Sequence, residues 1–137
     1  MIKGFFAYPS VPSIKETIIN AINIINGTDV IKIKGWEELN NSGITLINPI
    51  LEHINDAEVF LADLTCLNSN VLFELGYAIA KNKRILLFLD TSIEKSKTNF
   101  ERFGLTTLGY IQYNNSHDIN KGFFNVEPYS SITTLLK

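Results

Sequence analysis

Two nearly continuous apolar runs, 57–65 and 84–90, constrain the fold of this chain more than any other feature of its sequence. Neither run shows the apolar–polar alternation of a half-exposed strand, so each is typical of a β-strand that is buried on both faces. A segment with helical spacing, 70–82, joins the two runs. Two buried strands joined by a helix form a right-handed crossover in a parallel sheet. The sequence therefore predicts an α/β protein.

The segments on either side continue the alternation of strands and helices. Further strands are expected at 2–8, 29–34 and 110–113, and further helices at 13–26, 44–55 and within 91–104. The alternating residues of 29–34 predict an edge strand. This order predicts a five-stranded, mainly parallel sheet with helices on both faces. The tail is left open: its FFNVEP stretch suits a strand or a loop, and SSITTLLK is similar to the start of a helix.

Local signals predict where several helices begin and end. Ser13 is a favourable N-cap, and Glu16 lies three residues later, where a capping-box partner is expected. Gly27 is expected to end the same helix. Pro49 is expected either to kink the helix at 44–55 or to mark a later start.

Length, charge and cysteine content limit the class of protein. A chain of 137 residues fits one domain, 1–137, and the tail leaves open whether that domain is cut from a longer chain. A net charge of −2 argues against a nucleic-acid partner, and the lack of a long apolar run argues against a membrane partner. One cysteine cannot form an internal disulfide, so we expect a reducing cytoplasm. His53 and His117 have no ligand spacing, so no metal is expected.

In a doubly wound sheet, ligands bind beyond the carboxyl ends of the strands. The corresponding loops are 7–13, 34–42, 63–70 and the residues that follow 90. The candidate substrate-binding residues in or beside these loops are Tyr8, Ser10, Trp36, Asp63, Thr65, Asn70 and Tyr77.

Glu74 is the candidate catalytic residue. It is expected in the first turn of the helix at 70–82, beside the apolar stripe of that helix. A helix N-terminus favours the ionised carboxylate, whereas partial burial opposes ionisation. Such a carboxylate can stabilise an oxocarbenium-like transition state or attack the carbon of a sugar.

Each candidate also has a purely structural interpretation. Glu74 could serve only to complement the helix dipole. Asp63 and Thr65 could close their loop through Asx-type hydrogen bonds. Asn70 is most simply an N-cap. Trp36 could stack on a flat heteroaromatic ring or pin its loop to the domain.

The stretch DLTCLNSNVLFELGYAIAKNKRILLFL, residues 63–89, resembles the motif D-L-T-x-x-N-x-N-V-x-x-E-L-G-x-A followed by a basic turn and a strand. This motif belongs to the TIR-like and nucleoside 2-deoxyribosyltransferase-like superfamily. The GFFAYPS stretch, 4–10, also resembles the first strand and loop of that family. The resemblance implies a flavodoxin-like three-layer sandwich that cleaves N-glycosidic bonds. The sequence departs from the pattern at Cys66, where glycine is common, and at Ser69, where proline is common, which affects the stiffness of the loop.

The resemblance also implies roles for individual residues. Glu74 matches the catalytic glutamate of the family. Asp63 matches the aspartate that ends the third strand, and Asn70 matches the asparagine that opens the helix. Tyr8 and Ser10 fall where family members line the base or ribose pocket.

The number of carboxylates bears on the substrate. Hydrolysis of an O-glycoside normally uses two carboxylates, one of which protonates the leaving oxygen. The nicotinamide of NAD+ is a cationic pyridinium that departs as a neutral molecule, so one carboxylate can suffice. The TIR-like resemblance therefore implies an NAD+ glycohydrolase, with NAD+ as substrate and no cofactor. It also implies a bacterial antiviral effector that is activated by self-assembly, through a sensor domain or a partner protein.

Two alternatives are open. The chain could be a nucleoside 2-deoxyribosyltransferase or a nucleoside hydrolase, with Glu74 as nucleophile and Asp63 as the proton donor to the base. It could also be a non-catalytic nucleotide-binding or adaptor domain.

Overall fold

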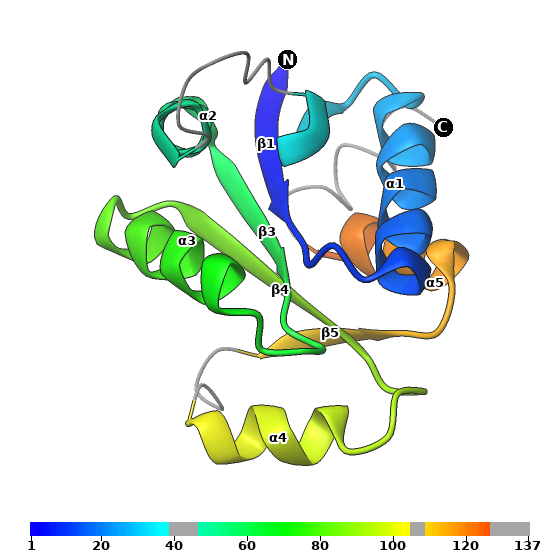
Figure 1. The fold of residues 1–137 in the computed structure, drawn as a ribbon. Helices are drawn as coiled ribbons and strands as arrows, with labels where there is room; N and C mark the ends of the chain where they lie inside the picture. The colour runs from blue at the N-terminus through cyan, green and yellow to red at the C-terminus, as the bar shows by residue number, and fades with distance from the viewer. Residues whose placement is uncertain (39–46, 105–108, 127–137) are drawn as a thin grey trace.

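A computed structural model of the protein describes residues 1–38, 47–104 and 109–126 (Figure 1). Strands and helices alternate along these residues, as expected. The elements are β1 (Ile2–Ala7), α1 (Pro12–Asn26), β2 (Ile31–Gly35), the short 3-10 helix η1 (Trp36–Glu38), α2 (Ile47–Asp56), β3 (Val59–Asp63), α3 (Ser69–Ala80), β4 (Arg84–Asp90), α4 (Ser96–Phe103), β5 (Tyr110–Tyr113) and α5 (Ser116–Phe124).

The five strands form one sheet in the order β2-β1-β3-β4-β5, and all four neighbouring pairs are parallel. The two continuous apolar runs became β3 and β4, which lie inside the sheet, while the alternating run became the edge strand β2. Figure 1 shows α1 and α5 on one side of the sheet and α2 and α3 on the other. The predicted three-layer, flavodoxin-like α/β fold with a five-stranded sheet is therefore confirmed.

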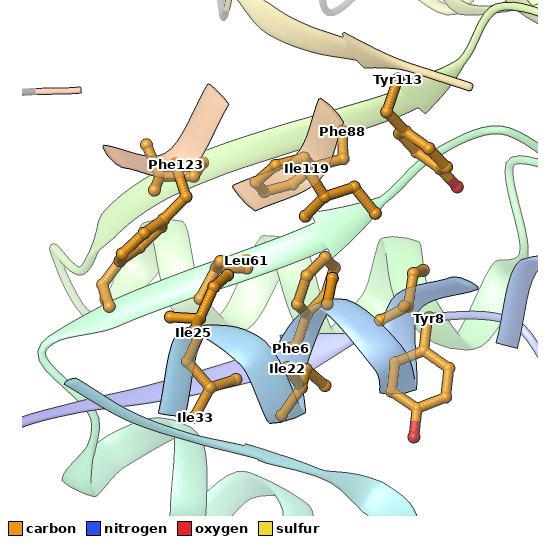
Figure 2. Close-up of a cluster of buried hydrophobic side chains, with 14 of the residues drawn as sticks. Phe6, Tyr8, Ile22, Ile25, Ile33, Leu61, Phe88, Tyr113, Ile119 and Phe123 are labelled. Atoms are coloured by element: carbon orange, nitrogen blue, oxygen red, sulfur yellow. The ribbon is translucent and has the colours of Figure 1, made fainter. Parts of the chain in front are cut away.

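Two apolar clusters fill the spaces between the sheet and its helices. Figure 2 shows the first cluster, in which Phe6, Leu61 and Phe88 come from three adjacent strands. The rings of Phe6 and Phe88 lie 5.2 Å apart, and Ile22 of α1 and Ile119 of α5 cover them. The second cluster packs α2, α3 and Phe100 of α4 against the other face.

Helix α5 was not predicted. The first residues of the FFNVEP stretch, Phe123 and Phe124, end this helix instead of forming a strand or a loop. Asn115 caps the helix by accepting a hydrogen bond from the backbone N–H of Asp118. Ile119 and Phe123, four residues apart, then fall on one face and are buried against the sheet.

The predicted N-cap of α1 is wrong by two residues. Pro12 is the first helical residue, and the N-cap is Val11, which has no side-chain capping bond. Ser13 therefore lies inside the first turn, where it cannot form the expected capping box with Glu16. Proline suits this position because its fixed φ matches a helix and its missing N–H has no partner to lose. The predicted end at Gly27 is confirmed.

Helix α2 spans Ile47–Asp56 in the described part of the chain, and Pro49 lies within the first of its described turns. Ile54 of this helix faces the core and is fully buried. The residues at 39–46 and the SSITTLLK stretch lie outside the described residues. No helix among the described residues is long and apolar enough to cross a membrane.

Candidate active site

A pocket of about 310 Å³ opens beyond the carboxyl ends of β1 and β2, beside the start of α3. This is the edge of the sheet at which ligands were expected. Its lining residues are Tyr8, Pro9, Ser10, Trp36, Ile50, Leu51, Asn68, Asn70, Val71, Phe73 and Glu74. The pocket thus brings together five of the predicted site residues, namely Tyr8, Ser10, Trp36, Asn70 and Glu74.

Glu74 lies in the second turn of α3, not in the first turn as predicted, because the helix begins at Ser69. It continues the buried stripe of Val71, Leu75 and Ala78. Ile79 lies outside this face and is 44% exposed. Helix α3 therefore places the Glu74 carboxylate in the pocket wall, next to the apolar side chains of Val71 and Phe73.

The Glu74 carboxylate is 8% exposed, and its Oε2 atom has no hydrogen-bond partner within the described residues. Burial raises the pKa of this group to about 7, because desolvation disfavours the ionised form. The interpretation in which Glu74 only complements the helix dipole does not explain a buried oxygen without a partner. An exposed first-turn glutamate would serve that purpose, and the first turn of α3 contains no acidic residue.

The N-cap of α3 is Asn68, so the prediction that Asn70 caps this helix is wrong. The side-chain oxygen of Asn68 accepts hydrogen bonds from the backbone N–H groups of Asn70, at 2.9 Å, and Val71, at 3.2 Å. Leu67, just before the cap, has a φ of 48°, in the left-handed region. This turn lets Asn68 cap the helix and line the pocket at the same time.

Tyr8 and Trp36 form an aromatic wall of the pocket, with ring centroids 6.0 Å apart. The Tyr8 hydroxyl donates to Glu37 Oε1 at 3.0 Å, and Glu37 Oε2 forms an ion pair with Lys15 Nζ at 2.9 Å. A Cβ atom on Gly35 would lie only 2.7 Å from the Tyr8 hydroxyl, so a residue without a side chain is needed beside this ring. Trp36 packs against both apolar clusters, as expected of a residue that pins its loop to the domain, and it also lines the pocket. Stacking of its ring on a ligand stays a prediction.

Asp63, Thr65 and Tyr77 do not line this pocket. The fully buried Asp63 carboxylate accepts hydrogen bonds from the Thr65 N–H at 3.0 Å, from Thr65 Oγ1 at 3.1 Å and from the Tyr113 hydroxyl. Burial raises the pKa of Asp63 to about 6, although these hydrogen bonds lower it. The Asx-type loop closure considered for Asp63 and Thr65 is therefore present. Direct contact of these three residues with a substrate stays a prediction.

Several lining residues were missed at the level of the sequence. Phe73 is 53% exposed at the pocket, and Ile50 and Leu51 of α2 approach from a different part of the chain. The motif and the N-cap preference of asparagine could have identified Asn68. For Phe73, Ile50 and Leu51, the sequence carries no signal that separates a pocket wall from an ordinary apolar face.

Other potentially reactive groups are not arranged for catalysis. Cys66 is exposed in the loop before α3, and burial together with the nearby Asp63 raises the pKa of its thiol. The thiol is therefore a poor nucleophile at neutral pH. The described part of the chain contains no group of three or more histidine, cysteine, aspartate or glutamate side chains that could hold a metal ion.

No protein-family model matches the sequence, and no curated protein matches it significantly. Among solved structures, the fold is similar to that of a CMP N-glycosidase from Clostridium botulinum, with a TM-score of 0.61 and 16% identity over 88% of this chain and 97% of that chain. It is also similar to a protein described as pilus assembly-related from Burkholderia pseudomallei, with a TM-score of 0.52 and 9% identity over 91% and 88% of the two chains. At these identities, the comparisons establish a shared fold.

Proposed function

We propose that this protein cleaves the N-glycosidic bond of a nucleotide substrate, with Glu74 acting at the anomeric carbon. The environment of the Glu74 carboxylate is the observation that carries this proposal. The group lies in the wall of a pocket, is almost fully buried, and has an oxygen without a partner within the described residues. Buried polar atoms nearly always have a partner, so an exception at a pocket is typical of a functional group.

A positive charge beside Glu74 would compensate for the burial of its carboxylate. With a pKa of about 7, a large fraction of this group is protonated at neutral pH. An approaching cation lowers that pKa and favours the ionised form. Cleavage of a glycosidic bond develops such a charge, because its transition state resembles an oxocarbenium ion. The interaction is therefore strongest in the transition state, as catalysis requires.

Within this class, we propose NAD+ as the substrate. Its nicotinamide leaves as a neutral molecule and needs no proton donor. Glu74 is the only carboxylic acid among the described residues that line the pocket. Asp63, which a neutral leaving base would need as its proton donor, lies outside the lining and is bonded to Thr65 and Tyr113. A site with one carboxylate favours NAD+ over a neutral nucleoside.

In the proposed reaction, the bond between C1′ of the ribose and the pyridinium nitrogen breaks, and its electron pair moves onto that nitrogen. Ionised Glu74 stabilises the positive charge that develops on the ribose, or bonds to C1′. Water then attacks C1′ and releases a proton, so the products are nicotinamide, ADP-ribose and H+. The rings of Tyr8 and Trp36 form a surface against which the flat nicotinamide can pack.

A mononucleotide such as CMP is the second candidate substrate, favoured by two observations. The solved neighbour with a TM-score of 0.61 is a CMP N-glycosidase. The cavity of about 310 Å³ lies at the small end of the usual range for ligand pockets, roughly 300–1,000 Å³. In that case Glu74 would act as the nucleophile, and cytosine would need a proton from a group other than Glu74.

The proposal is tested by incubating the protein with NAD+ and, separately, with CMP, and by measuring free nicotinamide and free cytosine. The protein is assayed both alone and fused to an oligomerising tag, because TIR-like effectors are expected to act as assemblies. We expect release of nicotinamide, and a loss of at least about 100-fold in Glu74→Gln, comparable to removal of one key electrostatic group in other enzymes.

Glu101→Gln is the matched control, since it makes the same chemical change on the exposed face of α4. It should leave the rate unchanged. Full activity of Glu74→Gln would contradict the role of this residue. Release of cytosine without nicotinamide would identify the second candidate as the substrate. No turnover of either compound by the assembled protein would favour the adaptor interpretation.

A further inference from the structure

A second cavity, of about 210 Å³, lies against β1 and β2 and is lined by Lys3, Gly4, Lys32, Lys34, His53, Asp56 and Ala57. We propose that this basic cavity binds a diphosphate group. It shares no lining residue with the pocket that contains Glu74. The proposal therefore does not depend on the proposed function.

Strand register brings the three lysines together. In the parallel pair of β1 and β2, Lys3 lies directly opposite Lys32, and Lys34 lies two residues farther along β2. Ile31 and Ile33 alternate with these lysines and are buried in the first apolar cluster, on the α1 side. The lysines therefore project from the opposite face of the sheet, where His53 and Asp56 of α2 complete the cavity.

No ion pair joins these lysines to a carboxylate in the described part of the chain, although Asp56 lines the same cavity. The ion pair found there joins Lys15 to Glu37, and no hydrogen bond to a described residue involves the ammonium groups of Lys3, Lys32 or Lys34. Like charges directly opposite each other on neighbouring strands are destabilising. A bound anion would convert this repulsion into attraction and form charge-assisted hydrogen bonds with the ammonium groups.

Protection of the sheet edge explains only part of this arrangement. Lysines on an edge strand discourage pairing with a second sheet, which would account for Lys32 and Lys34 on β2. Lys3 lies on β1, which is paired on both sides by β2 and β3. A lysine on an interior strand has no edge to protect, yet it faces the same cavity.

Three features oppose the binding of an anion. Glu58 is an exposed carboxylate that the β1–β3 register places opposite Lys3, and its backbone N–H donates to the Lys3 carbonyl at 2.8 Å. Asp56 contributes one negative charge, and the C-terminal end of α2 carries a partial negative charge of about half a unit. Part of the latter is offset, because Lys83 Nζ donates to the Asn55 carbonyl at 2.7 Å. Three ammonium groups outnumber the two carboxylates. An anion with several charged oxygens can form charge-assisted hydrogen bonds with more than one of these groups at once, which is why we propose a diphosphate group over a monovalent anion.

Binding is tested by isothermal titration of the full chain with pyrophosphate at low ionic strength, about 50 mM salt. We expect saturable binding that weakens at least about 10-fold in the double variant Lys32→Ala/Lys34→Ala and at about 300 mM salt. Asp56→Asn removes one opposing charge and should tighten binding about 2- to 5-fold. A parallel titration with ADP distinguishes the source: equal affinity identifies a free diphosphate, and tighter binding identifies a nucleotide.

The double variant Lys97→Ala/Lys121→Ala is the matched control, because it removes the same charge from exposed positions on α4 and α5. It should bind pyrophosphate as the unmodified chain does. Equal weakening in the two double variants would show a non-specific charge effect and overturn the proposal. Absence of pyrophosphate binding by the unmodified, folded chain would overturn it as well, and so would tighter binding by Lys32→Ala/Lys34→Ala.

Discussion

At the scale of the single residue, Glu74 combines a stability cost with the chemical role proposed for it. Its carboxylate lies on a face of α3 that is otherwise apolar, and burial raises its pKa from 4.5 to about 7. The carboxyl group thus binds its proton more tightly in the folded than in the unfolded chain. The free energy of unfolding therefore falls as the pH rises from the unfolded-state pKa to the folded-state pKa. This cost is consistent with selection of the group for its chemistry.

Replacement of Glu74 by glutamine should therefore stabilise the protein at high pH. At pH 4 the carboxyl group is protonated in the folded chain and resembles the neutral amide. The cost of burying a carboxylate is therefore absent, and the two proteins should have similar free energies of unfolding. At pH 8 the carboxylate is ionised, and the difference in favour of Glu74→Gln should grow by up to about 3 kcal/mol. Urea denaturation at both values of pH measures this difference. Glu101→Gln should show no such growth, and a constant difference for Glu74→Gln would contradict the burial of its carboxylate.

At the scale of the element, the first turn of α3 links stability to the site. Asn68 caps the helix through two backbone N–H groups and also lines the pocket, and Glu74 follows about 1.7 turns later. The position of the carboxylate thus depends on where this helix begins. The N-cap of α3 was predicted two residues too late, at Asn70 instead of Asn68. Local sequence specifies such a start weakly when several good caps, Asn68, Ser69 and Asn70, lie next to one another.

Asn68→Ala should reduce both stability and activity. Loss of an N-cap costs about 0.5–2 kcal/mol, and the first turn of α3 would no longer be held in place. Asn115→Ala provides the comparison, because Asn115 caps α5 on the other side of the sheet through one backbone N–H. Both variants should lose free energy of unfolding in urea, within the range expected for an N-cap, whereas nicotinamide release should fall at least about 10-fold only in Asn68→Ala. Equal rates in the two variants would argue against a link between this cap and the site.

At the scale of the whole molecule, one buried hydrogen-bond network joins three strands at the carboxyl edge of the sheet. Asp63 at the end of β3 accepts from Thr65 and from Tyr113 of β5, and Thr65 Oγ1 accepts from the Asp90 N–H at the end of β4 at 2.9 Å. Figure 2 shows Tyr113 at the margin of the first apolar cluster. We infer that this network holds the edge strand β5 in place, and with it the loop that leads to α3.

Tyr113→Phe should destabilise the protein more at pH 8 than at pH 5. Below the Asp63 pKa of about 6, the variant loses a hydrogen bond between neutral groups, at a cost of about 1 kcal/mol. Above that pKa, it loses a bond to a buried carboxylate, at about 1.5–3 kcal/mol. Urea denaturation measures both values. Tyr110→Phe, on the same strand, should change stability equally at both values of pH, and the same behaviour in Tyr113→Phe would contradict a role for ionised Asp63.

Much of the fold could be predicted because it follows from local patterns. The continuous apolar runs at 57–65 and 84–90 can be buried only inside a parallel sheet, and the alternating run at 29–34 suits only an edge. Helix α5 was not predicted because its nine residues contain too short an apolar pattern to indicate a helix. The helix is stabilised by the packing of Ile119 and Phe123 against the sheet.

Five of the eight predicted site residues line one pocket. Tyr8, Ser10 and Trp36 follow strand ends, and Asn70 and Glu74 lie on the helix that follows β3, so a parallel sheet brings them to the same edge.

The sequence by itself determined that this chain is an α/β protein and that a glutamate lies close to the ligand-binding edge of its sheet, because hydrophobic periodicity and motif spacing are properties of the linear chain. Only the tertiary structure decided that Glu74 is buried without a partner, that Asp63 is bonded to Tyr113 fifty residues away, and that three lysines from two strands share one cavity. Burial, pairing and electrostatic environment depend on which distant segments come into contact, and those contacts exist only once the sheet has formed.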